Sequence, residues 1–169
     1  MGINTKISNK ENAYKATFLL IIIIIVSIIL PIFFLQIFPT STITKTLFSS
    51  PWCFLILFGL IVSIYFIFTG VYYFVFEANN YIIEIGSKRT VSSYFSSKSN
   101  YIEMPISSIE KFGFFNRPFT FNTILMVKFK VSRRKSIAKR FNFAFLSKKQ
   151  KDEMISVLQK IIQNNQLNG

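Results

Sequence analysis

The sequence contains no histidine and only one cysteine, Cys53, among its 169 residues. The commonest general base and the commonest metal ligand are therefore missing, and a single cysteine forms neither a disulfide framework nor a cysteine-based metal site. The glycines are isolated, so there is no phosphate-binding glycine loop, and no two carboxylates are placed for acid–base catalysis. We expect a protein that is not an enzyme and needs no cofactor or metal.

Acidic residues are also scarce, since 7 Asp and Glu oppose 20 Lys and Arg and leave a net charge of +13. Such a basic balance indicates nucleic acid, an anionic membrane surface or an acidic partner. The aromatic residues of the predicted strands alternate on core-facing positions and form no exposed stacking platform, which argues against nucleic acid. The lipid bilayer is the simplest partner.

Two long runs, residues 16–38 and 52–76, lack charge altogether. As a helix, the first would be about 35 Å long, enough to cross a hydrocarbon core of about 30 Å. Pro31 should kink this helix without ending it. The sequence therefore predicts a cytoplasmic tail over residues 1–15, a transmembrane helical hairpin over 16–77, and a soluble domain over 78–169.

The distribution of Lys and Arg predicts the orientation of this hairpin. Lys6, Lys10 and Lys15 precede the first run, Lys45 alone lies in the polar loop at 39–51, and the other 16 follow the second run. Positive charge stays inside, so we expect a multi-pass protein of the cytoplasmic membrane with both termini in the cytoplasm. Gly59 and Ser63 have a spacing that permits close helix approach, either within one chain or in a homo-oligomer.

The last 93 residues read mainly as strands. We expect a hairpin of residues 81–85 and 89–96 around a turn at 86–88, and further strands at 101–106, 109–115, 123–132 and 139–146. Leu125, Val127, Phe129 and Val131 should share a buried face, as should Phe141, Phe143 and Phe145. Ser147 and Gln150 have the spacing of a capping box, and an amphipathic C-terminal helix should follow them.

Three segments carry a family resemblance: YIIEIGSKRTVSSYF at 81–95, MPISSIEK at 104–111, and the phenylalanine strand at 139–146 that runs into SKKQKDEMISVLQKII at 147–162. Together they resemble the pleckstrin-homology-like (PH-like) domain of bacterial membrane proteins that carry two spans. The resemblance covers about residues 79–164. It implies an α+β fold in which a bent antiparallel sheet, the PH-like barrel, is closed by the C-terminal helix. A fold of this type says little about activity.

The basic side chains of the domain form its candidate binding surface. Five cations stand between residues 133 and 140, and others follow a strand or begin the C-terminal helix, where the helix dipole disfavours them. They could be a solvated face that only enforces topology, a contact with anionic lipid headgroups, or a specific phosphate pocket. The candidates are Lys88, Arg89, Arg133, Arg134, Lys135, Lys139, Arg140, Lys148 and Lys149.

These features favour a non-enzymatic, membrane-anchored PH-like module that binds a protein partner or the anionic membrane face. The alternative is a bacterial immunity protein that neutralises a cognate toxin, since the richness in Ile, Phe, Lys, Asn and Ser is typical of an AT-rich bacterial genome and suits both functions. A transporter or channel subunit is disfavoured because the two runs hold no ionisable residue.

Overall fold

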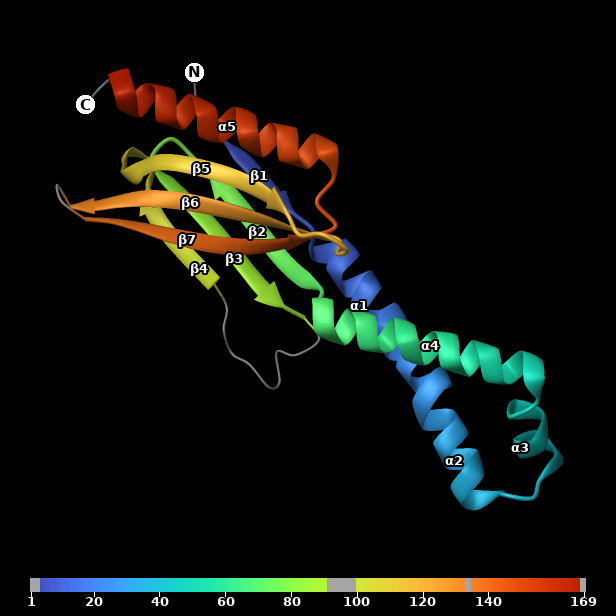
Figure 1. Ribbon diagram of the computed structural model, residues 1–169. Helices are drawn as coiled ribbons and strands as arrows, with labels where there is room; N and C mark the ends of the chain where they lie inside the picture. The colour runs from blue at the N-terminus through green and yellow to red at the C-terminus, as the bar shows by residue number, and fades with distance from the viewer. Residues whose placement is uncertain (1–3, 91–99, 133–134, 168–169) are drawn as a thin grey trace. The chain divides into compact units, whose positions relative to one another are not determined.

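The computed structural model describes residues 4–90, 100–132 and 135–167. The chain divides into two compact units (Figure 1). A helical unit comprises Tyr14–Gly70. A sheet unit combines residues 4–13 with the described residues from Val71 onward, so the helical unit is an insertion within it.

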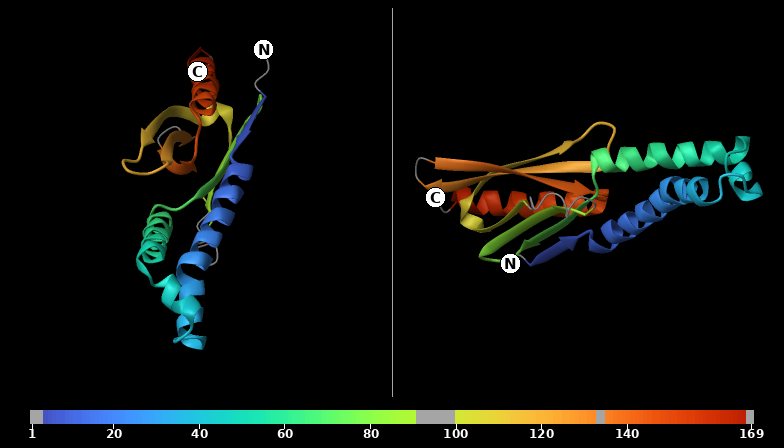
Figure 2. Two further views of the ribbon diagram at one scale, coloured as in Figure 1. Left: turned by 90° about the vertical axis from the view of Figure 1, so that its right-hand side faces the viewer. Right: turned by 90° about the horizontal axis from the view of Figure 1, so that it is seen from below.

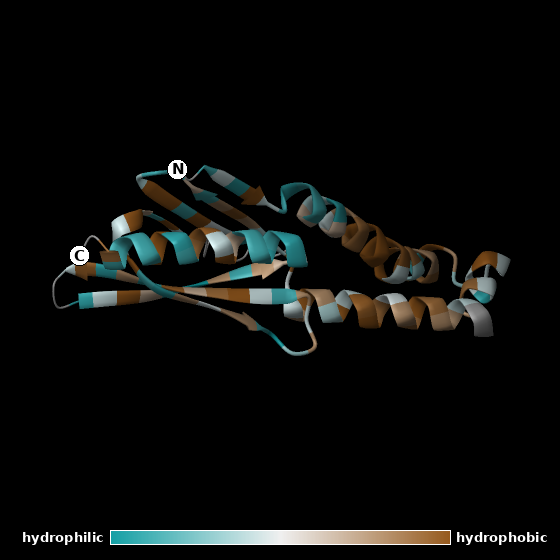
Figure 3. Ribbon diagram, turned by 90° about the horizontal axis from the view of Figure 1, so that it is seen from above, coloured by the Kyte–Doolittle hydropathy of each residue, from teal (hydrophilic) through white to brown (hydrophobic). Residues whose placement is uncertain are grey.

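The helical unit contains α1 (Lys10–Ile24, of which the first turn belongs to the sheet unit), a π-helical turn (Ile25–Ile29), α2 (Leu30–Ile37), α3 (Thr42–Leu47) and α4 (Ser50–Thr69). Two helical stretches, Lys10–Ile37 and Trp52–Thr69, are long and apolar enough to cross a membrane. Most of their apolar side chains point outward, and the ribbon there is brown in Figure 3. The two predicted helices are thus confirmed, whereas the loop expected at 39–51 contains the short helix α3.

The second apolar helix is shorter than the sequence predicted. It ends at Thr69, with Gly70 at φ 74° as its C-cap, and residues 72–76 belong to a strand instead of the predicted span. The left-handed φ is inexpensive for glycine, and the following Tyr-Tyr-Phe-Val-Phe run consists of aromatic and β-branched residues that favour strands.

The first helix accommodates Pro31 by widening one turn. The proline ring clashes with the carbonyl four residues earlier, which belongs to Ser27, and the π-helical turn surrounds that residue. The helix then continues to Ile37, as predicted. Ser27 is buried, and a Cβ on Gly59 of α4 would lie only 2.6 Å from the Ser27 Cβ. Gly59 therefore provides a close approach to the first helix of the same chain.

Gly59→Ala should weaken the packing of the two apolar helices by about 1–3 kcal/mol, because the new methyl group overlaps the Ser27 side chain. Unfolding of the full chain in mixed micelles with increasing SDS measures this loss. Combining Gly59→Ala with Ser27→Gly removes the overlapping Cβ and should restore most of the stability. A double variant as unstable as the single one would contradict the assigned contact.

The sheet unit consists of two antiparallel sheets and a C-terminal helix. One sheet has the order β1-β2-β3-β4 and the other β5-β6-β7. The strands are β1 (Thr5–Ser8), β2 (Tyr72–Ala78), β3 (Ile82–Arg89), β4 (Asn100–Pro105), β5 (Ile109–Asn116), β6 (Asn122–Ser132) and β7 (Lys135–Ala144). A 3-10 turn (Ile106–Ser108) precedes β5, and α5 is Lys148–Leu167. The described strands therefore form two sheets and no closed barrel, which corrects the single bent sheet that the sequence predicted (Figure 2).

The N-terminal segment is part of this unit, although the sequence predicted a separate tail over residues 1–15. Strand β1 pairs with β2, with Thr5 opposite Ala78 and Ser8 opposite Val75. The Lys6 ammonium lies 2.7 Å from the Glu77 carboxylate, and this hydrogen bond and charge raise the pKa of Lys6. A strand of four residues shows too little alternation to be recognised without its partner.

The predicted turn at 86–88 is wrong. Strand β3 continues through Gly86 and Ser87, because β2 and β4 both pair with it there. The expected partner strand at 89–96 overlaps β3 only at Arg89, and residues 91–99 lie outside the described part of the chain. Strand β3 pairs instead with β2, a segment whose apolar composition led the sequence analysis to include it in the second membrane span.

The strands predicted at 101–106, 109–115 and 123–132 and the C-terminal helix are confirmed. The strand predicted at 139–146 is β7, which runs from Lys135 to Ala144, so Phe145 lies past its end with φ 55° and is only half-buried. Leu125, Val127 and Phe129 of β6 are fully buried, but Val131 is 51% exposed because the β6–β7 register shifts between Lys130 and Ser132. Before α5, Gln150 N–H donates to Ser147 Oγ at 3.2 Å, and Ser147 N–H donates to Gln150 Oε1 at 3.1 Å, so the capping box is formed.

One hydrophobic core joins both sheets and α5. Its largest buried side chains come from β2, β3, β6, β7 and α5. Phe74 of β2 stacks on Phe143 of β7 with the ring centroids 4.3 Å apart. At the end of α5, the Asn165 amide donates to the carbonyls of Ile106 and Ile109 at 2.8 and 3.1 Å. Ile7 of β1 also belongs to this core, which therefore combines strands from both sides of the helical insertion in the sequence.

Candidate functional site

The strands of the sheet unit run between two opposite ends. We call one of them the exit end, because the chain leaves the sheet unit there after β1 and re-enters it there at the start of β2. Because neighbouring strands are antiparallel, this end also holds the end of β3, the β5–β6 loop, the end of β7 and the first turn of α5. The far end holds the β2–β3, β4–β5 and β6–β7 connections.

The Asn9 side chain links three strands at the exit end through hydrogen bonds. Its side chain donates to the carbonyls of Tyr72 and Ala144, both at 2.8 Å, and accepts from Phe74 N–H at 2.8 Å. It is only 3% exposed. One residue therefore joins β1 to β2 of its own sheet and to β7 of the other sheet, immediately before α1 begins.

The predicted basic residues do not form one cluster. Lys88, Arg89, Lys148 and Lys149 lie at the exit end, whereas Lys139 and Arg140 lie midway along β7 and Lys135 begins it at the far end. Arg133 and Arg134 lie outside the described residues. The cations from 135 to 140 follow an extended strand, so they spread over about 17 Å at ~3.4 Å per residue instead of gathering around a turn.

An aromatic loop at the exit end was missed by the sequence analysis. In the β5–β6 loop, which we call the aromatic loop (residues 117–121), Phe119 is 95% exposed with φ 56° and Phe121 is 60% exposed. Phe121 stacks on Phe145, which follows β7 at φ 55°, with centroids 5.7 Å apart. The signal in the sequence is the segment NRPFTFN, where large apolar residues stand in a turn.

Hydrogen bonds give this loop a defined shape. Arg117 N–H donates to the Asn122 carbonyl at 3.1 Å, and the Thr120 hydroxyl donates to the Arg117 carbonyl at 3.0 Å. Phe145 N–H donates to the Phe121 carbonyl at 3.1 Å, which fixes the loop to the end of β7. The exposed phenylalanines are thus presented by a bonded turn.

A groove of about 460 Å³ opens beside the aromatic loop. Lys148 and Lys151 of α5 line it together with Asn116, Thr120 and Thr123, and its apolar wall includes Phe121 and Phe145. The Lys151 Nζ also lies 5.6 Å from the centroid of the Phe114 ring, a cation–π distance. Cations, hydroxyls and aromatic rings therefore meet at one surface, which suits a group that is partly anionic and partly apolar.

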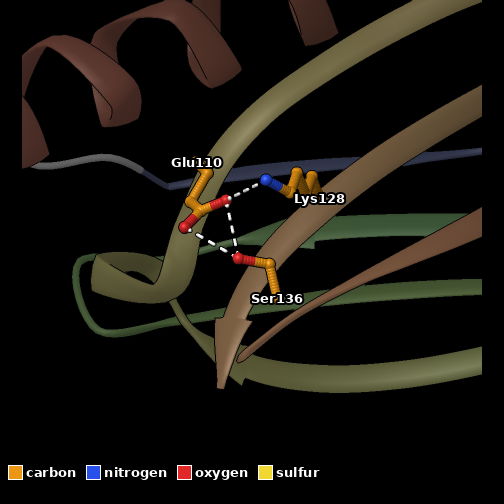
Figure 4. Close-up of polar contacts among 3 residues, drawn as sticks. All are labelled: Glu110, Lys128 and Ser136. Carbon is orange, nitrogen blue, oxygen red and sulfur yellow. Dashed lines mark hydrogen bonds and ion pairs between the residues drawn. The ribbon is translucent and has the colours of Figure 1, made fainter. Parts of the chain in front are cut away.

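A second polar cluster lies on the outer face of the three-stranded sheet (Figure 4). The Glu110 carboxylate of β5 lies 3.0 Å from the Lys128 ammonium of β6, and the Ser136 hydroxyl of β7 donates to it at 3.0 Å. The hydrogen bonds from Lys128 and Ser136 lower the pKa of Glu110 below its usual value of 4.5. This cluster links all three strands and is best explained as structural.

The Glu110 cluster predicts a pH effect. Because the folded pKa is lowered, its stabilisation is present above the unfolded value of 4.5 and is lost as the pH falls through the folded pKa. Urea unfolding midpoints should therefore drop on acidification more in the parent chain than in Glu110→Gln. Lys128→Gln, which removes the cation 3.0 Å from the Glu110 carboxylate, should reduce the drop in the same direction. Equal drops in all three proteins would contradict the assignment.

Within residues 4–90, 100–132 and 135–167, no group of three or more Cys, Asp or Glu side chains is placed to hold a metal ion. Comparison with known proteins identifies no relative: no family model matches the chain, and no curated protein or solved structure is significantly similar to it.

Proposed function

We propose that this protein is a non-enzymatic, membrane-anchored module: the two apolar helices cross the membrane as a hairpin and hold a PH-like domain at its cytoplasmic face. There the domain binds a protein partner or the anionic membrane face. The observation that carries this proposal is the insertion of the helical unit between β1 and β2, which are hydrogen-bonded neighbours.

The insertion favours two crossings over one. A single crossing would separate β1 from β2 and break all their pairs from Thr5–Ala78 to Ser8–Val75. The number of crossings must therefore be even. No crossing at all would leave two long helices with outward apolar side chains such as Phe54, Phe58 and Phe68 in water, which is strongly unfavourable. Two crossings satisfy both conditions.

The charge distribution supports the cytoplasmic side for the sheet unit. Lys45 is the one Lys or Arg in the connection between the apolar helices, whereas Lys6 and most of the other cations belong to the sheet unit. Because positively charged segments stay inside, the sheet unit and the connection should lie on opposite sides of the membrane.

The order of elements supports the PH-like assignment. A four-stranded and a three-stranded antiparallel sheet precede one C-terminal helix that packs on β5 and contributes to the core. In this assignment the hairpin is inserted after the first strand of the domain, so the domain does not simply follow the second span. Because such folds carry no fixed activity, the partner has to be inferred from the surface.

Reporter fusions test the proposed topology. A reporter that is active only outside the cytoplasm should be silent after Gly169 and active within the connection between α2 and α4, because the hairpin returns the chain to the side from which it started. The N-terminus should behave like the C-terminus, since β1 belongs to the same folded unit. Activity on opposite sides for the two termini would contradict the proposal.

A further inference from the structure

We propose that the aromatic loop is a second membrane contact of this protein: Phe119 and Phe121 enter the interface, while Lys148 and Lys151 bind lipid phosphates. The inference rests on the proposed function, because it needs the hairpin in a bilayer. In this proposal, the exit end binds the anionic surface of the same membrane that anchors the chain.

The chain between the sheet unit and the apolar runs is short. Residues 10–15 separate Asn9 from Ala16, the first residue of the uncharged run, and six helical residues extend about 9 Å at most. On the return, β2 begins at Tyr72, three residues after α4 ends. A polar headgroup layer is about 5–7 Å thick on each side of the hydrocarbon core. The exit end therefore has to lie close to the headgroups.

Hydrogen bonds hold the aromatic loop at the exit end. The Asn9 side chain is hydrogen-bonded to the Ala144 carbonyl, and the next residue, Phe145, is hydrogen-bonded to Phe121. The loop is thus connected by two hydrogen bonds to the residue that precedes α1. Moving the loop away from the exit end would break the bond between Phe145 and Phe121, which lies next to the terminal β6–β7 pair of Asn122 and Ala144.

The side chains of the aromatic loop suit an interfacial contact. Phe119 is nearly fully exposed and has a positive φ, which is unfavourable for a bulky residue. Exposed aromatic residues flanked by cations are the composition of interfacial membrane contacts. The first turn of α5 holds Lys148, Lys149 and Lys151 and no acidic residue. The helix dipole disfavours these cations, and anionic phosphate would offset that cost.

A tryptophan in the loop reports its depth in the membrane. Trp52 is the only tryptophan, so Trp52→Phe gives a background without one, into which Phe119→Trp is introduced as the loop probe. The matched control, the far-end probe, is Tyr81→Trp in the same background, because Tyr81 is 79% exposed in the β2–β3 turn. The full chains are reconstituted into phosphatidylcholine–phosphatidylglycerol vesicles, with or without bromine on the acyl chains near the headgroup.

We expect bromine to quench most of the emission of the loop probe and to leave the far-end probe nearly unchanged, because an interfacial contact buries its apolar side about 5–10 Å into the headgroup–acyl boundary. The emission of the loop probe should also be blue-shifted relative to that of the far-end probe. Adding Lys148→Gln and Lys151→Gln should reduce the quenching of the loop probe in anionic vesicles, and added salt should reduce it without these two changes.

A loop probe that is quenched no more than the far-end probe would overturn the proposal, and the loop would then be a surface for a protein partner. Quenching of the loop probe that is equal in neutral and anionic vesicles and insensitive to the lysine changes would overturn the phosphate contact. The chain with its native Trp52 distinguishes the two proposals, because Trp52 in the helical unit should be quenched whatever the loop does. Unquenched Trp52 would overturn the membrane hairpin and the loop contact together.

Discussion

A fragment of residues 79–169 is expected to remain unfolded, whereas a chain that joins residues 1–9 directly to 71–169 through a short Gly/Ser linker should fold. The fragment lacks β1 and β2, and with them the fully buried Phe74 and Phe76. Removing a buried phenylalanine side chain costs about 3–5 kcal/mol, and a domain has only about 5–15 kcal/mol of stability. The loss of two such residues and a strand partner exceeds what the fragment can tolerate.

Circular dichroism and urea titration of the two soluble proteins measure this difference. The joined chain should show a cooperative urea transition, because the linker replaces the helical unit at the point where Asn9 and Phe74 are already hydrogen-bonded. Phe74→Ala in the joined chain serves as an internal control and should lower the unfolding free energy strongly. A cooperative transition of fragment 79–169 would show that β1 and β2 do not belong to the core.

Asn9→Ala is expected to destabilise the sheet unit by about 3 kcal/mol or more, since it removes the hydrogen bonds that Asn9 makes to three backbone groups, two of them buried and one partly buried, at about 1–3 kcal/mol each. The affected groups are Phe74 N–H and the carbonyls of Tyr72 and Ala144. Chemical unfolding of the joined chain measures the effect. It should be larger than for most single polar substitutions because one side chain serves two sheets.

Asn100→Ala is the matched control for this variant. Asn100 is exposed and donates one hydrogen bond, to the Arg140 carbonyl at 3.0 Å. Its loss should cost no more than about 1.5 kcal/mol, the upper range for a hydrogen bond whose partner remains accessible to water. Similar losses in Asn9→Ala and Asn100→Ala would show that water or a neighbouring side chain replaces the Asn9 amide and that the exit end is not fastened by it.

The sequence alone determined the elements whose signals are local. The alternation of Leu125, Val127 and Phe129 with lysines predicted β6, because a strand with one buried face repeats every two residues. The Ser147–Gln150 spacing and the apolar stripe after it predicted α5, and both came from contacts within one turn or one helix. The two apolar helices followed from uncharged length in the same way.

Tertiary structure decided which segments belong together. Residues 5–8 carry almost no strand signal in the sequence, and they form a strand because they pair with β2. Residues 72–76 have the composition of a membrane span, but they form a strand because β1 and β3 pair with them. At the exit end, segments distant in sequence are held together because Asn9 donates to the Ala144 carbonyl and Phe145 N–H donates to the Phe121 carbonyl. Local patterns fix a residue's preference, but pairing and burial between distant segments supply the free energy that selects among such preferences.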